Sequence, residues 1–493
     1  MKYKFPMLLF LLLADQFGAN AQAAEAKEPK LAVAPHRIKL AGKAIAYTTH
    51  TGYMVLPDEK GKPKGNMFFM YYKKDGVTDP STRPITYVFN GGPGSPSMWL
   101  HMGMLGPRRI AMDDFGGPTA PPYKIVDNEY SWLDVTDLIF IDPVMTGYSR
   151  PAEGVEKKEF LGYEEDIESV GSFIHLATTR FERWNSPKFI AGESYGTIRA
   201  SGLSSYLQNT YGMYLNGIVL ISAVLNWETE VLLPGNDLPA ITYLPTFCAI
   251  AWYHKKAGTQ YTQLRPFLDE VEKFALGEYA TALLKGDRMT DAEKASLAEK
   301  LSALTGLSKA YIAQTNYRVN IRRFVKELLR DEHKTVGRLD GRFTGSDYDA
   351  AGETYEFDPS NAAIMGPFAM AINDYIRREL KYFEDNPYYT GGRARPWNYS
   401  NVQNRFLNVA ENLRSAMHQN PYLKVHITNG YYDLATPYFG TDYTVNHMFL
   451  NKDLRGNVTQ SFYEAGHMMY IHKPSIVQMK KDIDNFYERA LRR

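Results

Sequence analysis

The chain has 493 residues, 44% hydrophobic and 23% charged, and this globular composition excludes a disordered or fibrous protein. Its 56 Lys and Arg residues balance 55 Asp and Glu residues, so no basic excess favours binding to nucleic acid or anionic lipid. Cys248 is the only cysteine, which excludes an intramolecular disulfide and a multi-cysteine metal site. At this length a second domain or a large insertion is expected.

The N-terminus has the pattern of an export signal. Two lysines precede the apolar run Phe5–Ala14, which is too short to span a bilayer, and Ala-x-Ala cleavage options follow at Ala21 and Ala23. We therefore predict a signal peptide over residues 1–23 and an exported protein, periplasmic or secreted, with no stable membrane insertion after cleavage. An exported chain without disulfides fits a bacterial periplasm. The competing interpretation is an uncleaved N-terminal anchor.

Strand and helix patterns alternate at both ends of the remaining chain. An antiparallel pair is predicted for residues 36–47 and 66–73. Further strands are predicted at 84–90, 137–142, 187–192, 217–223, 423–428 and 458–463, and helices at 162–183 and 198–211. Strands that alternate with helices predict a mostly parallel sheet with helices on both faces.

The middle of the chain has a different character. Residues 287–306 have the pattern of two helices with a start at Thr290, and residues 316–332 are amphipathic and basic. A segment of this length cannot be a loop, so we predict a helical cap insertion over residues 231–414, above the carboxyl ends of the strands. The predicted core then consists of residues 24–230 and 415–493.

The first chemically informative turn is Gly192-Glu193-Ser194-Tyr195-Gly196, between a predicted strand and a predicted helix. A G-x-S-x-G elbow needs small residues at both ends because the turn is tight and the serine backbone is strained. The pattern alone is weak, but its strand–turn–helix context favours a nucleophilic role for Ser194. The alternative is an ordinary glycine-rich turn.

A nucleophilic serine needs a base, and the base needs a carboxylate that holds its tautomer. Asp433 follows the predicted strand 423–428 and His467 follows the strand 458–463, in the chain order Ser, acid, His. Asp442 is a rival acid that lies further from its strand. Of the other histidines, His472 has the pattern of a helix entry, and His447 that of a packing or surface residue.

A third turn, Asn90-Gly91-Gly92-Pro93-Gly94-Ser95, follows the strand 84–89. Backbone N–H groups exposed by its glycines can supply half of an oxyanion hole, and the N–H of Tyr195, which follows the nucleophile, can supply the other half. The competing interpretation is a phosphate-binding loop. Its spacing fits neither a dinucleotide fingerprint nor a Walker loop.

Four sequence blocks together resemble the serine carboxypeptidases, the carboxypeptidase Y and cathepsin A family. They are the loop Asn90–Gly94, the segment Asp142–Ser149, the elbow Gly192–Gly196 and Gly466-His467-Met468. They lie in the expected order and cover the chain to about residue 223 and from about residue 422. The insertion carries no recognisable motif.

The resemblance implies an α/β-hydrolase that removes single residues from peptides with a free C-terminus, without metal or cofactor. It implies these roles: nucleophile Ser194, base His467, acid Asp433, oxyanion donors Gly92 and Tyr195, and substrate-carboxylate ligands Asn90 and Glu193. A carboxyl group that faces a carboxylate must stay protonated to donate a hydrogen bond, so activity should favour acid.

Departures from the family pattern put subsite shape and pH optimum in doubt, not the reaction class. Ser95 stands where the family commonly has Cys, Met145 replaces a common Gly, and Tyr432 occupies a place where an acid is frequent. Two alternatives stay open. One is an esterase or acyltransferase on the same triad, and the other is a secreted protein that binds a partner without catalysis.

Overall fold

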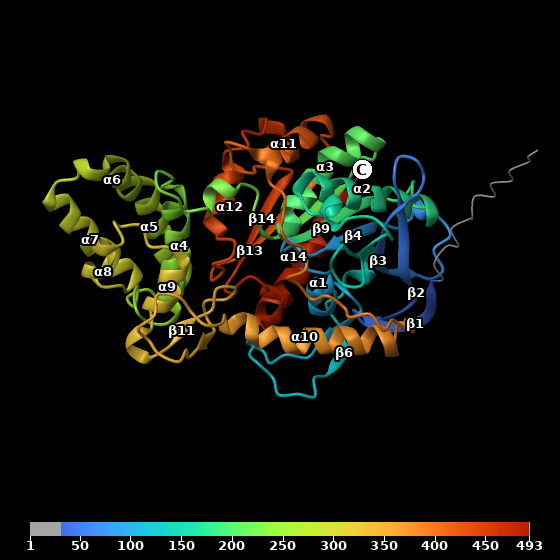
Figure 1. Cartoon of the computed structure of the whole chain (residues 1–493), viewed down its shortest axis with the longest axis horizontal. Coiled ribbons are helices and arrows are strands. Elements are labelled where there is room, and N and C mark those ends of the chain that lie inside the picture. The colour runs from blue at the N-terminus through green and yellow to red at the C-terminus, as the bar shows by residue number, and fades with distance from the viewer. Residues whose placement is uncertain (1–30, 493) are drawn as a thin grey trace, which may run out of the picture.

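The computed structural model describes residues 31–492, and within them ten strands form one mixed sheet at the centre of the molecule (Figure 1). The predicted signal peptide lies outside the described residues. The strands, in spatial order, are β1 (Ala32–Leu40), β2 (Lys43–Pro57), β3 (Pro63–Lys74), β7 (Asp137–Asp142), β4 (Ile85–Phe89), β9 (Lys188–Ser194), β10 (Gly217–Ala223), β13 (Lys424–Gly430) and β14 (Val458–Tyr463), with β8 (Arg150–Pro151) paired to β3.

The sheet changes from antiparallel to parallel along its width. Strands β1, β2, β3 and β7 pair antiparallel, and the six strands from β7 to β14 run parallel. Strand β4 lies between β7 and β9 although it precedes β7 in the chain, so the connections cross over with helices. The strand order and the helical layers confirm the predicted α/β-hydrolase fold.

Helices cover both faces of the sheet because its strands present apolar side chains on both. In β4, Tyr87 and Phe89 pack into the hydrophobic cluster of one face, and Val88 packs into the cluster of the other. The first cluster includes residues of α2 (Tyr163–Arg180), α3 (Tyr195–Tyr211) and α11 (Ala410–Gln419). The second includes residues of α1 (Met98–Leu100), α10 (Pro359–Arg378) and α14 (Lys473–Leu491).

A helical lobe stands beside the sheet, on the left of Figure 1, and has a hydrophobic core of its own. Its helices are α4 (Leu238–Tyr253), α5 (Leu264–Phe274), α6 (Ala280–Lys285), α7 (Asp291–Thr305), α8 (Lys309–Gln314) and α9 (Ile321–Glu327). The chain returns from the lobe through α10, which packs on the sheet domain. Helix α11, which packs against α3, extends across residue 414, where the insertion was predicted to end.

Two local details differ from the sequence prediction. Residues 36–47 form a hairpin rather than one strand, because Ala41 and Gly42 adopt positive φ values of 47° and 80° in a two-residue turn. The predicted helix pair over 287–306 is a short 3-10 turn followed by α7. The start of α7 is as predicted: Thr290 and Glu293 form a capping box.

The remaining strands and helices are short. They include β5 (Arg108–Ile110), β6 (Ile125–Asp127), β11 (Thr335–Val336), β12 (Thr344–Gly345), α12 (Tyr438–Asn446), α13 (Lys452–Arg455) and the 3-10 helix η10 (Met469–Ile471). Among residues 31–492, no helix combines the length and apolar character needed to cross a membrane.

A buried ionic cluster ties three segments of the sheet domain together. Asp137 accepts from Arg83 Nε at 2.9 Å and from Arg183 Nη1 at 2.5 Å, and all three side chains are buried. Its Oδ1 also accepts from the N–H of Lys74 at 3.0 Å. Because charges inside a protein are costly without partners, each member of this cluster depends on the others.

The substitution Asp137→Ala leaves two buried guanidinium groups without a counter-charge. We expect the free energy of unfolding, measured by urea denaturation, to fall by about 3–5 kcal/mol. The matched control is Glu129→Ala, which removes the surface partner of Arg109 and should cost about 0–1 kcal/mol. Equal losses in the two variants would contradict the importance assigned to the buried cluster.

Candidate active site

Ser194 occupies a strained position at the junction of a strand and a helix. It is the last residue of β9 and the N-cap of α3, with φ 60° and ψ −131°. A residue with a side chain adopts such angles at a cost of about 1–3 kcal/mol, and such strain is concentrated at functional sites. The elbow predicted from Gly192–Gly196 therefore has the backbone geometry that raises a serine hydroxyl above the sheet edge.

Glycines make this geometry possible because three stretches of backbone approach closely. A Cβ on Gly192 would lie 2.2 Å from the carbonyl oxygen of Gly196, and a Cβ on Gly91 would lie 2.4 Å from the amide nitrogen of Tyr195. The loop that begins at Asn90 thus packs directly on the elbow. Close backbone packing therefore accounts for glycine in this loop, and no bound phosphate is needed to explain it. The same packing brings the amides of Gly92 and Tyr195 into one region.

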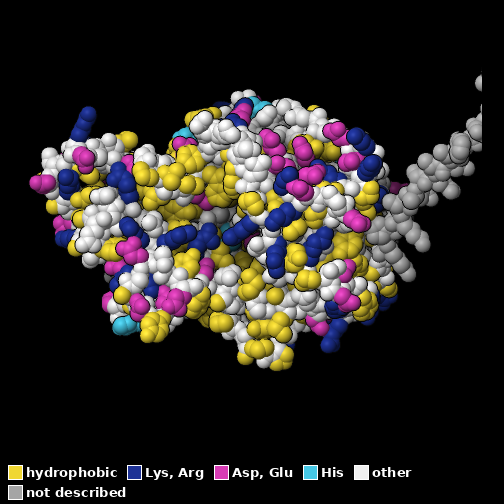
Figure 2. Space-filling view, in the orientation of Figure 1, with side chains coloured by type: hydrophobic (Ala, Val, Ile, Leu, Met, Phe, Trp, Pro, Cys, Tyr) yellow, Lys and Arg dark blue, Asp and Glu magenta, His cyan; other side chains and the backbone are white. Residues whose placement is uncertain are grey.

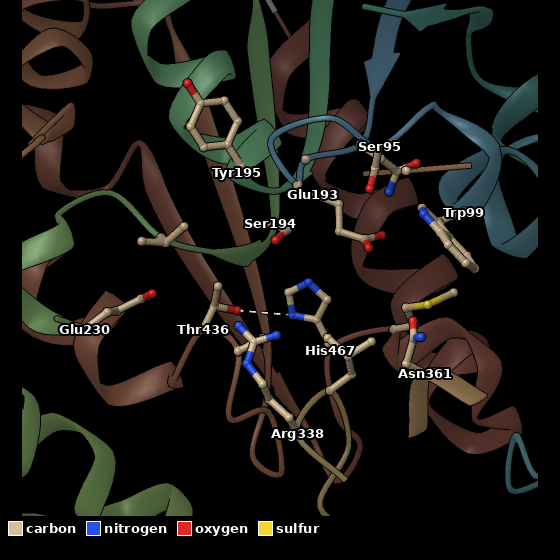
Figure 3. A pocket seen from close by; sticks show the side chains of 18 of the residues that line it. Ser95, Trp99, Glu193, Ser194, Tyr195, Glu230, Arg338, Asn361, Thr436 and His467 are labelled. Atoms are coloured by element: carbon tan, nitrogen blue, oxygen red, sulfur yellow. Dashed lines mark hydrogen bonds between the residues drawn. The ribbon is translucent and has the colours of Figure 1, made fainter. Parts of the chain in front are cut away.

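His467 and Asp433 form a buried pair. The Nδ1 of His467 donates to Oδ2 of Asp433 at 2.7 Å, and the Asp433 side chain is fully buried. Thr436 and Ala435 also donate to Asp433, through the Thr436 hydroxyl at 2.7 Å and the Ala435 N–H at 2.7 Å. Because Nδ1 donates to Asp433, the second ring nitrogen, Nε2, is left to accept a proton. Figure 3 shows Nε2 facing the Ser194 hydroxyl.

The charges around His467 oppose the effect of its burial. Burial lowers the pKa of His467, but the carboxylates of Asp433 and Glu193 outweigh it, so its pKa lies above the usual histidine value although Arg338 lowers it. The arrangement stabilises an imidazolium ion, which is what a histidine becomes when it accepts a proton from serine.

The rival residues lie elsewhere. Asp442 accepts from Gln460 and Asn446, both at 3.1 Å, and not from His467. His447 ends α12, where its ring stacks on that of Tyr443. His472 is the N-cap of α14, as its sequence context indicates.

Glu193 is a buried carboxyl group beside Ser194. The hydroxyl of Tyr470, in η10, donates to Glu193 Oε2 at 2.6 Å. Burial raises the pKa of Glu193 to about 7, although His467 and the Tyr470 hydrogen bond both lower it. Glu193 is therefore largely protonated in mild acid and can donate a hydrogen bond there.

Asn90 faces the same space. Its Oδ1 accepts from the N–H of Leu100 at 3.1 Å, which fixes the orientation of the side-chain amide. Its Nδ2 is buried and makes no hydrogen bond of normal geometry in the part of the chain that the structure describes, although it lies close enough to Glu193 to lower the pKa of that carboxyl group. A buried amide donor and a protonated carboxyl group side by side can hold an anion.

These side chains line one cavity of about 440 Å³ between the sheet domain and the lobe. Figure 3 shows Glu193, Ser95 and Trp99 on one side of Ser194 and His467, and Glu230 and Arg338 on the other. The cavity has one end with Asn90 and Glu193, and another end with the carboxyl group of Glu230 and the guanidinium group of Arg338. A substrate that fills both ends passes over Ser194.

One segment of the insertion, residues 337–341, is hydrogen-bonded to both triad loops. The N–H of His467 donates to Leu339 O at 2.6 Å, and the N–H of Leu434, next to Asp433, donates to Arg338 O at 3.1 Å. Asp340 accepts from the N–H of Gly466 at 3.0 Å. The insertion therefore takes part in positioning Asp433 and His467.

The comparisons with known proteins agree with this geometry. The family model described as serine carboxypeptidase matches residues 40–473. The chain belongs to the serine carboxypeptidase family.

Individual relatives within this family are distant. Serine carboxypeptidase-like 45 of Arabidopsis thaliana is 25% identical over 200 residues, 38% of each chain. The pheromone-processing carboxypeptidase KEX1 of Yarrowia lipolytica is 30% identical over 182 residues, 35% of this chain and 26% of the relative. The chain thus matches well under half the length of these relatives.

A solved structure gives the fold over a longer span. The prohormone-processing carboxypeptidase KEX1(Δ)p of Saccharomyces cerevisiae is similar over 90% of this chain and 91% of that chain, with a TM-score of 0.55 and 17% identity. At this identity the similarity supports the fold alone.

Several residues of the cavity could not be found from the sequence. Glu230 and Arg338 lie in or beside the insertion, which carries no motif. Thr436, and Tyr470, which contacts the cavity residue Glu193, do lie within three residues of Asp433 and His467, and that proximity is the one signal that could have indicated them. Nothing in the sequence shows which way their side chains point.

The elbow makes a direct prediction. In Gly192→Ala the new Cβ would meet the Gly196 carbonyl, so the backbone must shift and carry the Ser194 hydroxyl with it. A misplacement of about 1 Å can cost about 100-fold in rate, so we expect at least that loss in labelling of Ser194 by a fluorophosphonate probe. Gly277→Ala is the control, because a Cβ there meets no atom within 4 Å. Labelling of Gly192→Ala at the wild-type rate would show that the elbow tolerates displacement.

Proposed function

We propose that this protein is a serine carboxypeptidase that hydrolyses the C-terminal peptide bond of peptides through an acyl-enzyme on Ser194. The observation that carries the proposal is the position of Glu193, a buried and protonatable carboxyl group next to Ser194 in a cavity that also holds His467. A hydrolase that acts on chain ends needs such a group to recognise a terminal carboxylate.

The proton chemistry follows from the His467–Asp433 hydrogen bond. The Ser194 hydroxyl attacks the scissile carbonyl carbon while His467 Nε2 takes its proton. The imidazolium ion, stabilised by Asp433, then gives that proton to the departing amino group, and the C–N bond breaks. Water repeats the sequence with the same base, releasing the shortened peptide and restoring Ser194.

Negative charge forms on the carbonyl oxygen in each half of the reaction. The N–H groups of Gly92 and Tyr195 are the proposed donors to this oxyanion. The close packing of Gly91 against the Tyr195 amide supports their convergence on one point. Because these donors belong to the backbone, they need no reorganisation as the charge develops.

The substrate carboxylate is assigned to Asn90 Nδ2 and Glu193. A protonated Glu193 donates a hydrogen bond to the carboxylate, whereas an ionised Glu193 repels it. The pKa of Glu193 is raised to about 7, so binding of a terminal carboxylate should be strong below that pH and weaken as pH rises through it. This is the physical basis of the proposed preference for acid in the binding of the substrate carboxylate.

We also infer that the protein acts outside the cytoplasm. The support is the sequence pattern of residues 1–23, which is typical of an export signal. The exported protein would be either periplasmic or secreted. Free peptides and unfolded chain ends are the partners that such an enzyme would meet. The cavity lies between the sheet domain and the lobe, so a chain end reaches Ser194 more easily than an internal bond.

The triad can be tested by substitution. Ser194→Ala, His467→Ala and Asp433→Asn should each lower kcat for N-blocked dipeptides by about 10⁴-fold or more, with unchanged thermal unfolding. A double variant should cost little more than one, because the three residues act as a unit. EDTA should have no effect. Activity that EDTA removes and zinc restores would overturn the serine mechanism.

The carboxylate site predicts a distinctive pH profile. At pH 5, kcat/KM for a free-acid dipeptide should exceed that for its amide at least tenfold, and the ratio should fall as pH rises through about 7. Glu193→Gln should flatten this dependence because glutamine does not titrate. Taking the ratio cancels the titration of His467, which acts on both substrates.

Tyr470→Phe should shift the same pH profile toward higher pH without removing the preference for free-acid substrates. The Tyr470 hydroxyl stabilises ionised Glu193, so its removal raises the Glu193 pKa and should extend the free-acid preference to higher pH. Tyr422→Phe, on an exposed tyrosine, is the matched control. An unchanged profile in both Glu193→Gln and Tyr470→Phe would place the carboxylate site elsewhere and favour an esterase.

A further inference from the structure

The cavity extends on the side of Ser194 away from Glu193, where Glu230 and Arg338 lie (Figure 3). Glu230 ends a 3-10 turn in the connection from β10 to α4. Arg338 lies on the insertion, between β11 and β12. The two residues come from segments about a hundred positions apart in the chain, and neither belongs to the triad or to the proposed carboxylate site.

The backbone of Arg338 is held firmly relative to the triad. Its N–H donates to the carboxylate of Asp358 at 3.1 Å, and its carbonyl accepts from the N–H of Leu434 at 3.1 Å. The neighbouring Leu339 is bonded to His467 in the same manner. The backbone that carries the guanidinium group is therefore held in a fixed position next to Asp433 and His467.

The Arg338 side chain has no ion pair and no hydrogen bond within residues 31–492, although it lines the cavity. An arginine stays charged at every working pH. Its charge is felt across the cavity, since it lowers the pKa of both His467 and Glu230. A fixed cation without a counter-ion inside a cavity is a binding group for an anion.

Glu230 does not neutralise this cation in acid. Burial raises the pKa of Glu230 well above the usual glutamate value, and the Asp433 carboxylate raises it further, although Arg338 opposes both. Within the described residues, no ion pair or hydrogen bond joins Glu230 to Arg338. The other charged groups near this end, Asp433 and His467, are bonded to each other. This end of the cavity is thus cationic in the pH range where Glu193 is protonated.

Basic side chains also follow two segments that line the cavity. Two lining segments, at Ile321 and at Thr390–Gly391, continue into the exposed arginines Arg322, Arg393 and Arg395. In Figure 2, Lys and Arg side chains lie across the middle of the visible face, between the lobe and the sheet domain. Such a field attracts anionic ligands toward the cavity.

The direction of the substrate decides which of its residues meets Arg338. If the terminal carboxylate lies at Asn90 and Glu193, the residue whose carbonyl acylates Ser194 must extend to the opposite side. We propose that Arg338 binds the acidic side chain of that residue, so that the preferred substrates are peptides with Glu or Asp in the penultimate position. The proposal rests on the carboxypeptidase activity proposed above.

The test uses N-blocked dipeptides that share a C-terminal alanine and differ at the penultimate residue: Glu, Gln, Asp, Asn, Lys and Leu. At pH 5.5 a free glutamate side chain is ionised whereas Glu193 is mostly protonated. Wild-type kcat/KM should be at least tenfold higher for Glu than for its isostere Gln, with Lys the poorest substrate. A Glu/Gln ratio near one would overturn the proposal at once.

Substitutions test whether Arg338 causes the preference for a penultimate Glu over Gln. Arg338→Gln should bring the Glu/Gln ratio to about one, Arg338→Lys should keep part of it, and Glu230→Gln should keep or increase it because a potential anion is removed. The ratio is taken within each variant, so a general loss of activity cancels. An unchanged ratio in Arg338→Gln would contradict the proposal.

The failure of this proposal is distinct from the failure of the proposed function. Alanine release from the Leu substrate that disappears in Ser194→Ala would support the carboxypeptidase even where no acidic preference exists. No alanine release from any of the six dipeptides would instead contradict the carboxypeptidase itself. Should Arg338→Gln fail to fold by circular dichroism, the wild-type Glu/Gln ratio and the Arg338→Lys variant still decide the proposal.

Discussion

The site depends on one local constraint, the left-handed backbone of Ser194 at the edge of the sheet. That conformation, with φ 60° and ψ −131°, is unfavourable for a residue with a side chain, and such strain persists only where the surrounding structure holds it. Gly91 and Gly192 allow two other chain segments to approach within distances that a Cβ would forbid. The same packing brings the Asn90 loop to the elbow. The nucleophile and the proposed oxyanion donors therefore share one structural cause.

The helical insertion is more than a cover over the sheet. Its segment 337–341 hydrogen-bonds to the backbone beside Asp433 and to the backbone of His467, so the catalytic loops are held between the sheet and the insertion. The same segment carries Arg338 into the cavity. The positioning of the proposed triad and the proposed recognition of the acyl side of a substrate would thus both involve these five consecutive residues.

Electrostatics divides the cavity into two ends with different pH behaviour. At one end Glu193 changes charge near neutral pH, because burial opposes its ionisation whereas Tyr470 and His467 favour it. At the other end Arg338 keeps its charge throughout. In mild acid both ends can receive an anion, one through a protonated carboxyl group and the other through a guanidinium group. A peptide with an acidic penultimate residue and a free C-terminus has two anionic groups in the order that the proposals require, with the terminal carboxylate at Glu193 and the acidic side chain at Arg338.

The sequence by itself determined the fold class, the strand–helix order, the elbow at Ser194 and the order of Ser194, Asp433 and His467. Those features are local or follow from the order of elements along the chain, since a strained turn needs glycine at set positions and parallel strands bring their carboxyl ends to one edge. The hairpin turn at Ala41–Gly42 was missed because it does not interrupt the apolar pattern. Tertiary structure alone decided that Tyr470 binds Glu193 and that Arg338 and Glu230 share a cavity with Ser194. Such contacts join side chains that are distant in the chain, and their direction is set by packing, which no local pattern encodes.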